Sequence, residues 1–448
     1  MTDATAPSLP RKSKSLLAED DRTKKRNAAE KRFKYYGIAA ISVGLVFLVI
    51  LVATILREGT PAFTRTAVTV DFVLTQEQFD EAESAVLKTA AYTRLFSQFV
   101  ADQAEEKGVA TDLTDEDRAE IAAGLERIMG KIGSDIRVHY RENPDDVGSP
   151  VRFNLAAASR VDAYLNNGQS RDGFVSSRFL EEQDLDLIDA MVEIDMIGSD
   201  WDRTFFFGSD SGVDNPGGAG IGVAVVGSFF MMIVVLVLSL PISVAASIYL
   251  EEFAPKNRFT DLIEVNISNL AAVPSIVFGI LGLAVFIQFM HLPQSAPLVG
   301  GLVLTLMTLP TIIISTRASL KSVPPSIRDA ALGVGASKMQ TVFHHVLPLA
   351  APGILTGTII GLAQALGETA PLLLIGMVGF VARAYPDTFV GGFTEANSVM
   401  PAQIYTWASR ADPGFYEKAW GGIIILLVFL LTMNIIAIIL RRRFERRW

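Results

Sequence analysis

Six long apolar blocks dominate this 448-residue chain and leave few folds open to it. The first block, residues 36–56, has no charged residue. A helix of that length covers the roughly 30 Å hydrocarbon core of a bilayer, because it rises about 1.5 Å per residue. We therefore expect six membrane-spanning helices. The other five blocks lie at about residues 221–250, 267–289, 298–314, 354–380 and 421–440.

A cleaved signal peptide is the alternative for the first block. The block is longer than the apolar region of such a peptide, begins after 35 residues and lacks a small-x-small exit, so we expect it to remain as the first span. Prolines interrupt several later blocks and predict kinked helices, whose freed carbonyl groups neighbouring helices must satisfy. Such kinks are typical of a helix bundle and not of a single anchor; the prolines are Pro241, Pro274, Pro310 and Pro371.

Basic residues are unevenly distributed among the segments that join the blocks. Residues 1–35 hold ten Lys and Arg residues, and residues 441–448 hold five. Residues 251–265 and 317–350 hold two and four, whereas the short connections on the other side carry Arg383, Arg410 and Lys418. Basic residues accumulate on the cytoplasmic side of a membrane. We therefore expect a multi-pass protein of the cell inner membrane with both termini in the cytoplasm.

Residues 57–216 depart from the apolar pattern and predict a separate, mostly helical, water-soluble domain on the outer side of the membrane. They hold 15 Lys and Arg residues against 32 Asp and Glu residues, a net charge of −17. A ligand sensor or docking platform is one interpretation, but we favour an acidic, solvated insertion, because charge runs usually mark a solvated face. This charge would also repel an anionic cargo. Apolar spacing predicts helices at 79–101, 115–132 and 180–197, and short strands at 67–74 and 135–140.

Several classes of chemical site are missing from the sequence. The chain has no cysteine, which excludes disulfides, thiolate metal sites and cysteine nucleophiles. Its four histidines show no HExxH or His-x-His spacing, so we expect no metal site. A net charge of −9 argues against nucleic-acid binding, and no GxxxxGK[ST] loop is present to hold ATP phosphates. We therefore expect no catalytic residue, metal or cofactor on this chain.

The loop between the fourth and fifth blocks, residues 317–350, predicts two short helices around a hinge. The Pro324–Pro325 pair suits a helix start, Gly335 permits a turn, Ser337 can cap the second helix, and Pro348 is expected to end it. The second helix has one apolar face, formed by Met339, Val342, Phe343 and Val346. Either the protein's own membrane helices or a partner must cover that face.

Part of this loop resembles a known motif. Asp329, Ala330 and Ala331, followed by Gly335 and by Leu347-Pro348, are similar to the EAA loop of ABC importer permeases. Asp329 stands where the family usually has Glu, and His345 stands where it usually has Ile. The resemblance implies that residues 324–348 dock on a separate ATPase, which binds ATP and Mg²⁺, and transmit its closure to the membrane. The implied coupling residues are Asp329, Ala330, Ala331, Gly335, Met339, Val342, Phe343, Leu347 and Pro348.

Further segments resemble the phosphate-specific branch of this family, the PstA permeases. These segments are residues 247–254, 269–279, 367–372 and 401–407, and the resemblance covers about residues 217–448. It implies a type I importer core and three kinds of partner: a PstC-like second permease, a PstB-like ATPase dimer and a PstS-like periplasmic phosphate-binding protein. Many members carry Arg where this chain has Gln364, which puts any mechanism that needs this arginine in doubt.

Glu368 is the only ionisable residue well inside any block. A charge at mid-span costs about 2.5–3.5 kcal/mol on insertion scales, so a functional site facing the bundle interior is the default interpretation. A protonated glutamate that bridges helices is the alternative. The resemblance favours translocation, with Gly367, Glu368, Thr369 and Pro371 as the implied residues. No block contains Arg or Lys, so an anion must find positive charge on a partner, or use backbone N–H groups and hydroxyls such as those of Thr305, Thr308, Thr311 and Thr369.

The sequence thus predicts an all-α polytopic membrane protein with six spans and an inserted periplasmic domain. Its expected function is that of a permease subunit in an ATP-driven phosphate importer, in contact with membrane lipid. A permease for another oxyanion or small solute is one alternative, and a membrane-anchored periplasmic sensor is another. The expected segments are a basic tail (1–35), the first span (36–56), the acidic domain (57–216), the permease core (217–440) and a second basic tail (441–448).

Overall fold

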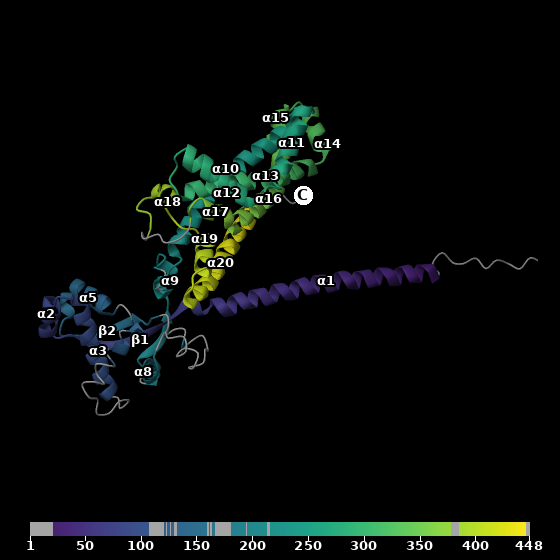
Figure 1. Ribbon diagram of the computed structural model, residues 1–448. Coiled ribbons are helices and arrows are strands. Elements are labelled where there is room, and N and C mark those ends of the chain that lie inside the picture. Colours follow the sequence, from purple (N-terminus) through teal and green to yellow (C-terminus); the bar gives the residue numbers. More distant parts are fainter. Residues whose placement is uncertain are drawn as a thin grey trace, which may run out of the picture. The chain divides into compact units, whose positions relative to one another are not determined.

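The computed structural model divides the chain into two compact units, residues 1–56 and 57–448. The first unit contains most of α1 (Asp21–Gly59), a helix that includes the first expected span and is longer than it (Figure 1). The structure describes residues 21–106, 121, 123–125, 127–129, 132–158, 161, 164–165, 181–193, 195–212, 216–377 and 385–444.

A three-stranded antiparallel sheet forms the centre of the inserted domain, residues 57–216, which we call the insertion domain. β1 (Thr64–Val73) lies between β2 (Pro150–Ala156) and β3 (Ile197–Trp201). Buried and exposed residues alternate along most of β1, so one face of the sheet is covered. Val70 pairs with Phe153, and Val68 pairs with Ile197. The strand expected at 67–74 is thereby confirmed.

Helices cover the buried face of this sheet. Phe96 of α3, Ile136 of α5 and Leu185 of α8 are fully buried in the same apolar cluster as Phe72 of β1. The second expected strand, 135–140, is wrong, because these residues lie in helix α5. The expected helix at 79–101 is two helices, and most of the one at 115–132 lies outside the described residues. The helices are α2 (Gln76–Ser84), α3 (Lys88–Glu106), α5 (Ile132–Glu142), α8 (Glu182–Glu193) and α9 (Arg203–Phe207).

The membrane part begins at α10. In the described residues, five helices including α1 are long and apolar enough to cross a bilayer, and a bent pair raises the number to six if it counts as one span. The second half of the bent pair, Ser275–Phe289, lies in the third expected block, and most of the first half, Arg258–Leu270, precedes that block. The two halves differ in direction by 101°. The helices from α10 onward are α10 (Gly222–Ile248), α11 (Arg258–Leu270), α12 (Ser275–Gly282), α13 (Pro297–Ser322), α14 (Pro325–Gly333), α15 (Lys338–Thr341), α16 (Leu347–Gly367), α17 (Ala370–Leu374), α18 (Gly391–Thr394), α19 (Met400–Ala408) and α20 (Pro413–Phe444).

The prolines act differently from one block to another. Pro241 and Pro310 lie inside α10 and α13 without ending them. Pro274 is the N-cap residue of α12, at the sharp bend of the broken pair, and Pro371 lies in the first turn of α17. The fifth block is therefore not one helix, because α16 ends at Gly367 before α17 begins.

Small residues allow α13 and α16 to pack closely. Gly353 and Gly357 of α16 face Ser319 and Ser315 of α13, and a Cβ atom on either glycine would overlap the facing serine. Hydroxyl groups join α10 to α13 as well, because Ser247 donates to the carbonyl oxygen of Ile313 at 3.1 Å. Such close packing holds together the two helices, α13 and α16, between which the loop lies.

Candidate coupling loop and translocation segment

Two short helices, α14 and α15, form the loop, as the sequence predicts (Figure 1). Between them Gly335 has a φ of +91°, a conformation that glycine adopts readily, so the predicted turn is confirmed. The Ser337 hydroxyl accepts a hydrogen bond from the N–H of Gln340, and the Gln340 side chain accepts one from the N–H of Ser337. This reciprocal capping box confirms the predicted cap.

Pro348 does not end the second helix, contrary to our expectation. A π turn, Val342–Val346, follows α15 and runs directly into α16, where Pro348 lies in the first turn. In the π turn the N–H of Leu347 bonds to the carbonyl of Val342, five residues back. The wider turn leaves room for the proline ring, so the helical path from Lys338 to Gly367 is continuous. The loop is thereby joined directly to a membrane span.

The predicted apolar face is divided between buried and exposed residues. Val342 and Val346 are buried and belong to one cluster with Ile248 of α10 and Leu320 of α13. Met339 and Phe343 are 58% and 44% exposed. The chain's own helices therefore cover one half of the face and leave the other half accessible.

The rest of the implied coupling set shows the same division. Ala331 is buried, Leu347 and Pro348 are half-buried, and Asp329, Ala330 and Gly335 are exposed. Two neighbouring apolar residues outside the implied coupling set are also exposed. The exposed fraction is 48% for Leu332 and 86% for Val334. We call Leu332, Val334, Met339 and Phe343 the loop patch.

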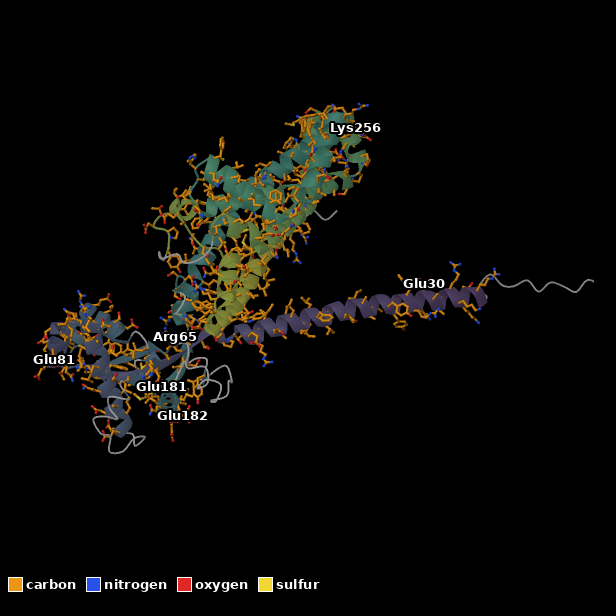
Figure 2. All side chains as sticks on the ribbon, viewed as in Figure 1. Glu30, Arg65, Glu81, Glu181, Glu182 and Lys256 are labelled. Carbon is orange, nitrogen blue, oxygen red and sulfur yellow. The ribbon has the colours of Figure 1, made fainter. Side chains whose placement is uncertain are left out.

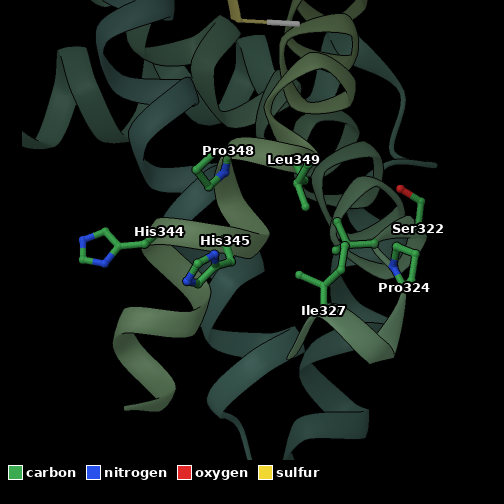
Figure 3. A pocket seen from close by; sticks show the side chains of 8 residues that line it. Ser322, Pro324, Ile327, His344, His345, Pro348 and Leu349 are labelled. Atoms are coloured by element: carbon green, nitrogen blue, oxygen red, sulfur yellow. The ribbon is translucent and has the colours of Figure 1, made fainter. Parts of the chain in front are cut away.

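A cavity of about 610 Å³ opens beside the loop (Figure 3). His344 and His345 are both exposed, and Figure 3 shows that their rings point in different directions. The described residues contain no group of three or more His, Cys, Asp or Glu side chains that could hold a metal. His345 lines this cavity and is not part of the buried apolar cluster, which contains Val342 and Val346. The cavity is lined by Ser322, Val323, Pro324, Ile327, His344, His345, Pro348 and Leu349.

The implied translocation segment lies at a helix break. Glu368 follows the last residue of α16 in an extended conformation, with φ −81° and ψ 124°. On the other side of the break, Pro371 lies against α12, so close that a Cβ atom on Gly279 would come within 2.7 Å of the proline Cα. The two sequence segments 269–279 and 367–372 therefore meet where α12 packs on α17.

Glu368 itself is half-buried, with Gln364 and Gly367 exposed on the preceding turn. In the part of the chain that the structure describes, Glu368 makes no ion pair. Two of the four candidate hydroxyls are already engaged, because Thr305 donates to the carbonyl of Gly301 at 2.7 Å and Thr308 to that of Thr305 at 3.1 Å. Both are buried, which indicates a packing role for these two threonines.

Comparisons with known proteins match the two parts of the chain separately. Residues 241–448 match the family described as binding-protein-dependent transport system inner membrane component, and residues 20–173 match a domain of unknown function, DUF3333. The probable ABC transporter permease protein YqgI of Bacillus subtilis (strain 168) is 30% identical over 230 residues, which cover 49% of this chain and 77% of that protein. The phosphate transport system permease protein PstA 1 of Mycobacterium tuberculosis (strain CDC 1551 / Oshkosh) is 30% identical over 51% of this chain and 72% of its own length.

The chain belongs to the PstA-type permeases of ABC importers. It is therefore a multi-pass membrane permease subunit and not an enzyme, and ATP hydrolysis and substrate capture are tasks of partner subunits. Among solved structures, the inward-facing MetNI methionine ABC transporter aligns with a TM-score of 0.38 at 14% identity, over 51% of this chain and 95% of that chain.

An acidic pair at the end of α10 contacts both α13 and the loop helix α14 in this PstA-type permease. Glu251 and Glu252 lie in the π turn Tyr249–Phe253. Arg328 of α14 pairs with Glu252 at 2.7 Å, and Arg317 of α13 lies 3.5 Å from Glu251. We did not predict these contacts. In the sequence, the two adjacent acids Glu251 and Glu252 are the signal that could have pointed to these ion pairs. Their partners could not be identified from it, because they follow more than 60 residues later.

Two buried ion pairs fasten the exit of the insertion domain to the permease core. Asp202 and Lys418 are 2.7 Å apart, and their side chains are 0% and 9% exposed. Asp210 and Arg410 are 2.6 Å apart, at 1% and 10%. Asp210 also accepts a hydrogen bond from the indole of Trp407 at 2.8 Å. In the sequence, Arg410 and Lys418 stand out only as charges in a short connection, because nothing near them reveals their partners.

The insertion domain of this PstA-type permease presents acidic side chains on its surface, among them Glu81, Glu181 and Glu182 (Figure 2). Glu83 at the end of α2 differs, because Arg137 of α5 donates to it at 2.7 Å. This hydrogen bond, opposed by partial burial and assisted by Lys88, lowers the pKa of Glu83 from 4.5 to about 2. Glu83 therefore joins α2 to α5 within the fold.

Proposed function

We propose that this chain forms half of the translocation pathway of an ATP-driven phosphate importer. The cargo assignment is supported by the phosphate permeases among its relatives, which are 28–30% identical over about half of the chain. The partners in this proposal are a PstC-like second permease, a PstB-like ATPase dimer and a PstS-like phosphate-binding protein. Both termini lie in the cytoplasm.

The loop patch carries the coupling part of the proposal. Four apolar side chains that are 44–86% exposed on a polar loop favour a protein partner that covers them. The buried residues behind the patch, Val342 and Val346, pack on the ends of α10 and α13. A push on the patch would therefore reach the membrane helices directly. ATP and Mg²⁺ bind to the partner ATPase in this proposal.

Glu368 carries the translocation part. Its half-buried carboxyl group lies at a helix break beside the exposed residues Gln364 and Gly367, which favours an interface with the second permease. None of the six apolar blocks contains Arg or Lys, so the positive charge that pairs with Glu368, or that attracts phosphate, comes from this second permease.

The cargo is tested by uptake of radiolabelled phosphate in cells that lack the gene, with and without a plasmid copy. We expect high-affinity phosphate uptake to be lost and then restored, while sulfate and molybdate uptake stay unchanged. Unchanged phosphate uptake, or loss of sulfate or molybdate uptake in its place, would contradict the assignment.

The loop patch is tested with the double variant Met339→Ser/Phe343→Ser. We expect the ATPase to co-purify at least tenfold less with this permease, because the docking surface has lost its apolar side chains. Val138 and Val192 of the insertion domain are 51% and 43% exposed and offer a matched control, Val138→Ser/Val192→Ser, which should retain the ATPase. Equal ATPase recovery with both variants would exclude the patch as the docking surface.

A further inference from the structure

One arginine joins the coupling loop to two membrane helices. The guanidinium group of Arg328 donates to Glu252 at 2.7 Å and 3.2 Å. It also donates to the carbonyl oxygens of Leu320 at 2.9 Å and Val323 at 2.8 Å. These carbonyls belong to the end of α13, where helices leave acceptors without partners. Arg328 of α14 is therefore bonded at once to α13 and to the π turn that ends α10.

The surroundings of this contact favour a fixed geometry. The side chains of Glu252 and Arg328 are 9% and 22% exposed, so solvent screens their pairing only in part. Charge-assisted bonds of a planar guanidinium to several acceptors fix its orientation. An apolar cluster that includes Ile248, Leu320 and Val346 adds packing between the same helices and the second half of the loop.

Neighbouring ion pairs do not involve the loop helices α14 and α15. Glu251 lies 3.5 Å from both Arg317 and Lys321 of α13, and Arg317 pairs with Glu264 of α11 at 2.6 Å. These contacts tie the membrane helices to one another. Among the described residues, Glu252–Arg328 is the ion pair that connects α14 to the end of α10.

We propose that Glu252 and Arg328 form a rigid joint that makes the coupling loop move together with α10 and α13. The inference rests on the proposed coupling to an ATPase, and it adds the positioning residues through which force enters the membrane. If the joint is broken, the ATPase can still dock on the loop patch and hydrolyse ATP, but α10 no longer follows the loop.

The test uses the complete importer in proteoliposomes and measures phosphate transported per ATP hydrolysed. We expect Glu252→Gln and Arg328→Gln each to lower this ratio about tenfold while ATP hydrolysis stays within threefold of wild type. The double variant should be no worse than either single one, and Arg328→Lys should retain an intermediate ratio. The matched control Glu264→Gln, which removes an ion pair that does not touch α14 or α15, should change the ratio less than twofold.

The proposed joint would be wrong if Glu252→Gln left the ratio of phosphate transported to ATP hydrolysed unchanged. It would also be wrong if transport and hydrolysis fell in proportion. A double variant with additive losses would contradict it as well. Failure of the proposed function looks different, because the wild-type assembly itself would then show no phosphate uptake or no associated ATPase.

A cross-link provides a second measurement that does not depend on how well these variants assemble. The chain has no cysteine, so Glu252→Cys/Arg328→Cys introduces one defined pair. A short bismaleimide bridge should restore the phosphate-to-ATP ratio at least fivefold over the unbridged double variant, because the two positions stay together throughout the cycle. If bridging blocks transport, the two elements must separate during the cycle, and the rigid joint is wrong.

Discussion

Glu368 is an ionisable residue inside an apolar block, where a charge is costly and therefore indicates a function. We expect Glu368→Gln to abolish phosphate uptake, by at least about tenfold, without loss of assembly, because the amide keeps the size of the side chain but cannot pair with a positive charge. Glu395 is a matched control, since it is likewise the C-cap residue of a helix, α18. Uptake is measured with radiolabelled phosphate and assembly by co-purification. Normal transport by Glu368→Gln would remove this residue from the mechanism.

Glu83 shows how one residue makes the insertion domain sensitive to acid. Its pKa is about 2 in the fold against an ordinary 4.5, chiefly because of the hydrogen bond from Arg137. Since the folded-state pKa is the lower one, the ionised carboxylate stabilises the domain above pH 4.5, and this contribution is lost as the pH falls toward 2. The side chain is 24% exposed, so we expect about 1–2 kcal/mol.

Glu83→Gln should therefore destabilise the region around α2 and α5 at pH 6 and have much less effect near pH 2. Pulsed hydrogen exchange of peptides from these helices in the full-length protein measures this difference. Glu77→Gln serves as the control, because Glu77 is an exposed acid in the first turn of the same helix. Equal effects of Glu83→Gln at both pH values would show that its charge does not stabilise the fold.

At the scale of elements, the contact between α13 and α16 depends on the absence of one methyl group. A Cβ atom on Gly357 would overlap Ser315, so Gly357→Ala should force the two helices apart and cost about 1–3 kcal/mol. Gly333 has open space around it, and Gly333→Ala should leave stability within about 0.5 kcal/mol. Thermal unfolding in detergent measures both. A melting temperature of Gly357→Ala equal to that of Gly333→Ala would mean that the helices can adjust freely.

Elements that carry local signals were predictable from the sequence, and those chosen by distant contacts were not. The turn at Gly335 and the cap at Ser337 follow from residue types that suit only these positions. Residues 135–140 alternate in polarity like a strand, but Ile132, Ile136 and Tyr140 also recur at helical spacing, and all three are buried. Packing against β1, which a local pattern does not reveal, decides between the two.

The same limit applies to the candidate site. The sequence did not show which half of the apolar face at residues 339–346 is exposed and which is buried. Periodicity indicates that a helix has an apolar face, but not which other element covers it. Arg328 and Glu252 are 76 residues apart, and Asp202 and Lys418 are 216 apart. Pairs at such separations become visible only once the helices are placed.

For the whole molecule, the orientation in the membrane can be tested at two exposed valines. Val86 of the insertion domain is 99% exposed and Val334 of the loop is 86% exposed. With no native cysteine, each can be replaced singly by Cys and labelled with a membrane-impermeant maleimide. We expect Val86→Cys to react in intact spheroplasts and Val334→Cys only after permeabilisation. The reverse pattern would invert the proposed orientation.

Two deletions separate the folding role of the insertion domain from its effect on transport. The paired ends Thr64 and Trp201 face each other in the sheet, so a short Gly-Ser linker can replace residues 65–200 without stretching the chain. This variant keeps Asp202 and Asp210 as partners of Lys418 and Arg410, and we expect it to assemble and to transport phosphate within about twofold of wild type, as a solvated insertion should. Removing residues 65–210 takes away the acidic partners of Lys418 and Arg410. We expect this to cost about 3–5 kcal/mol of folding free energy for each pair and to abolish assembly. If the shorter deletion assembles but does not transport, the domain takes part in transport itself and is more than an insertion.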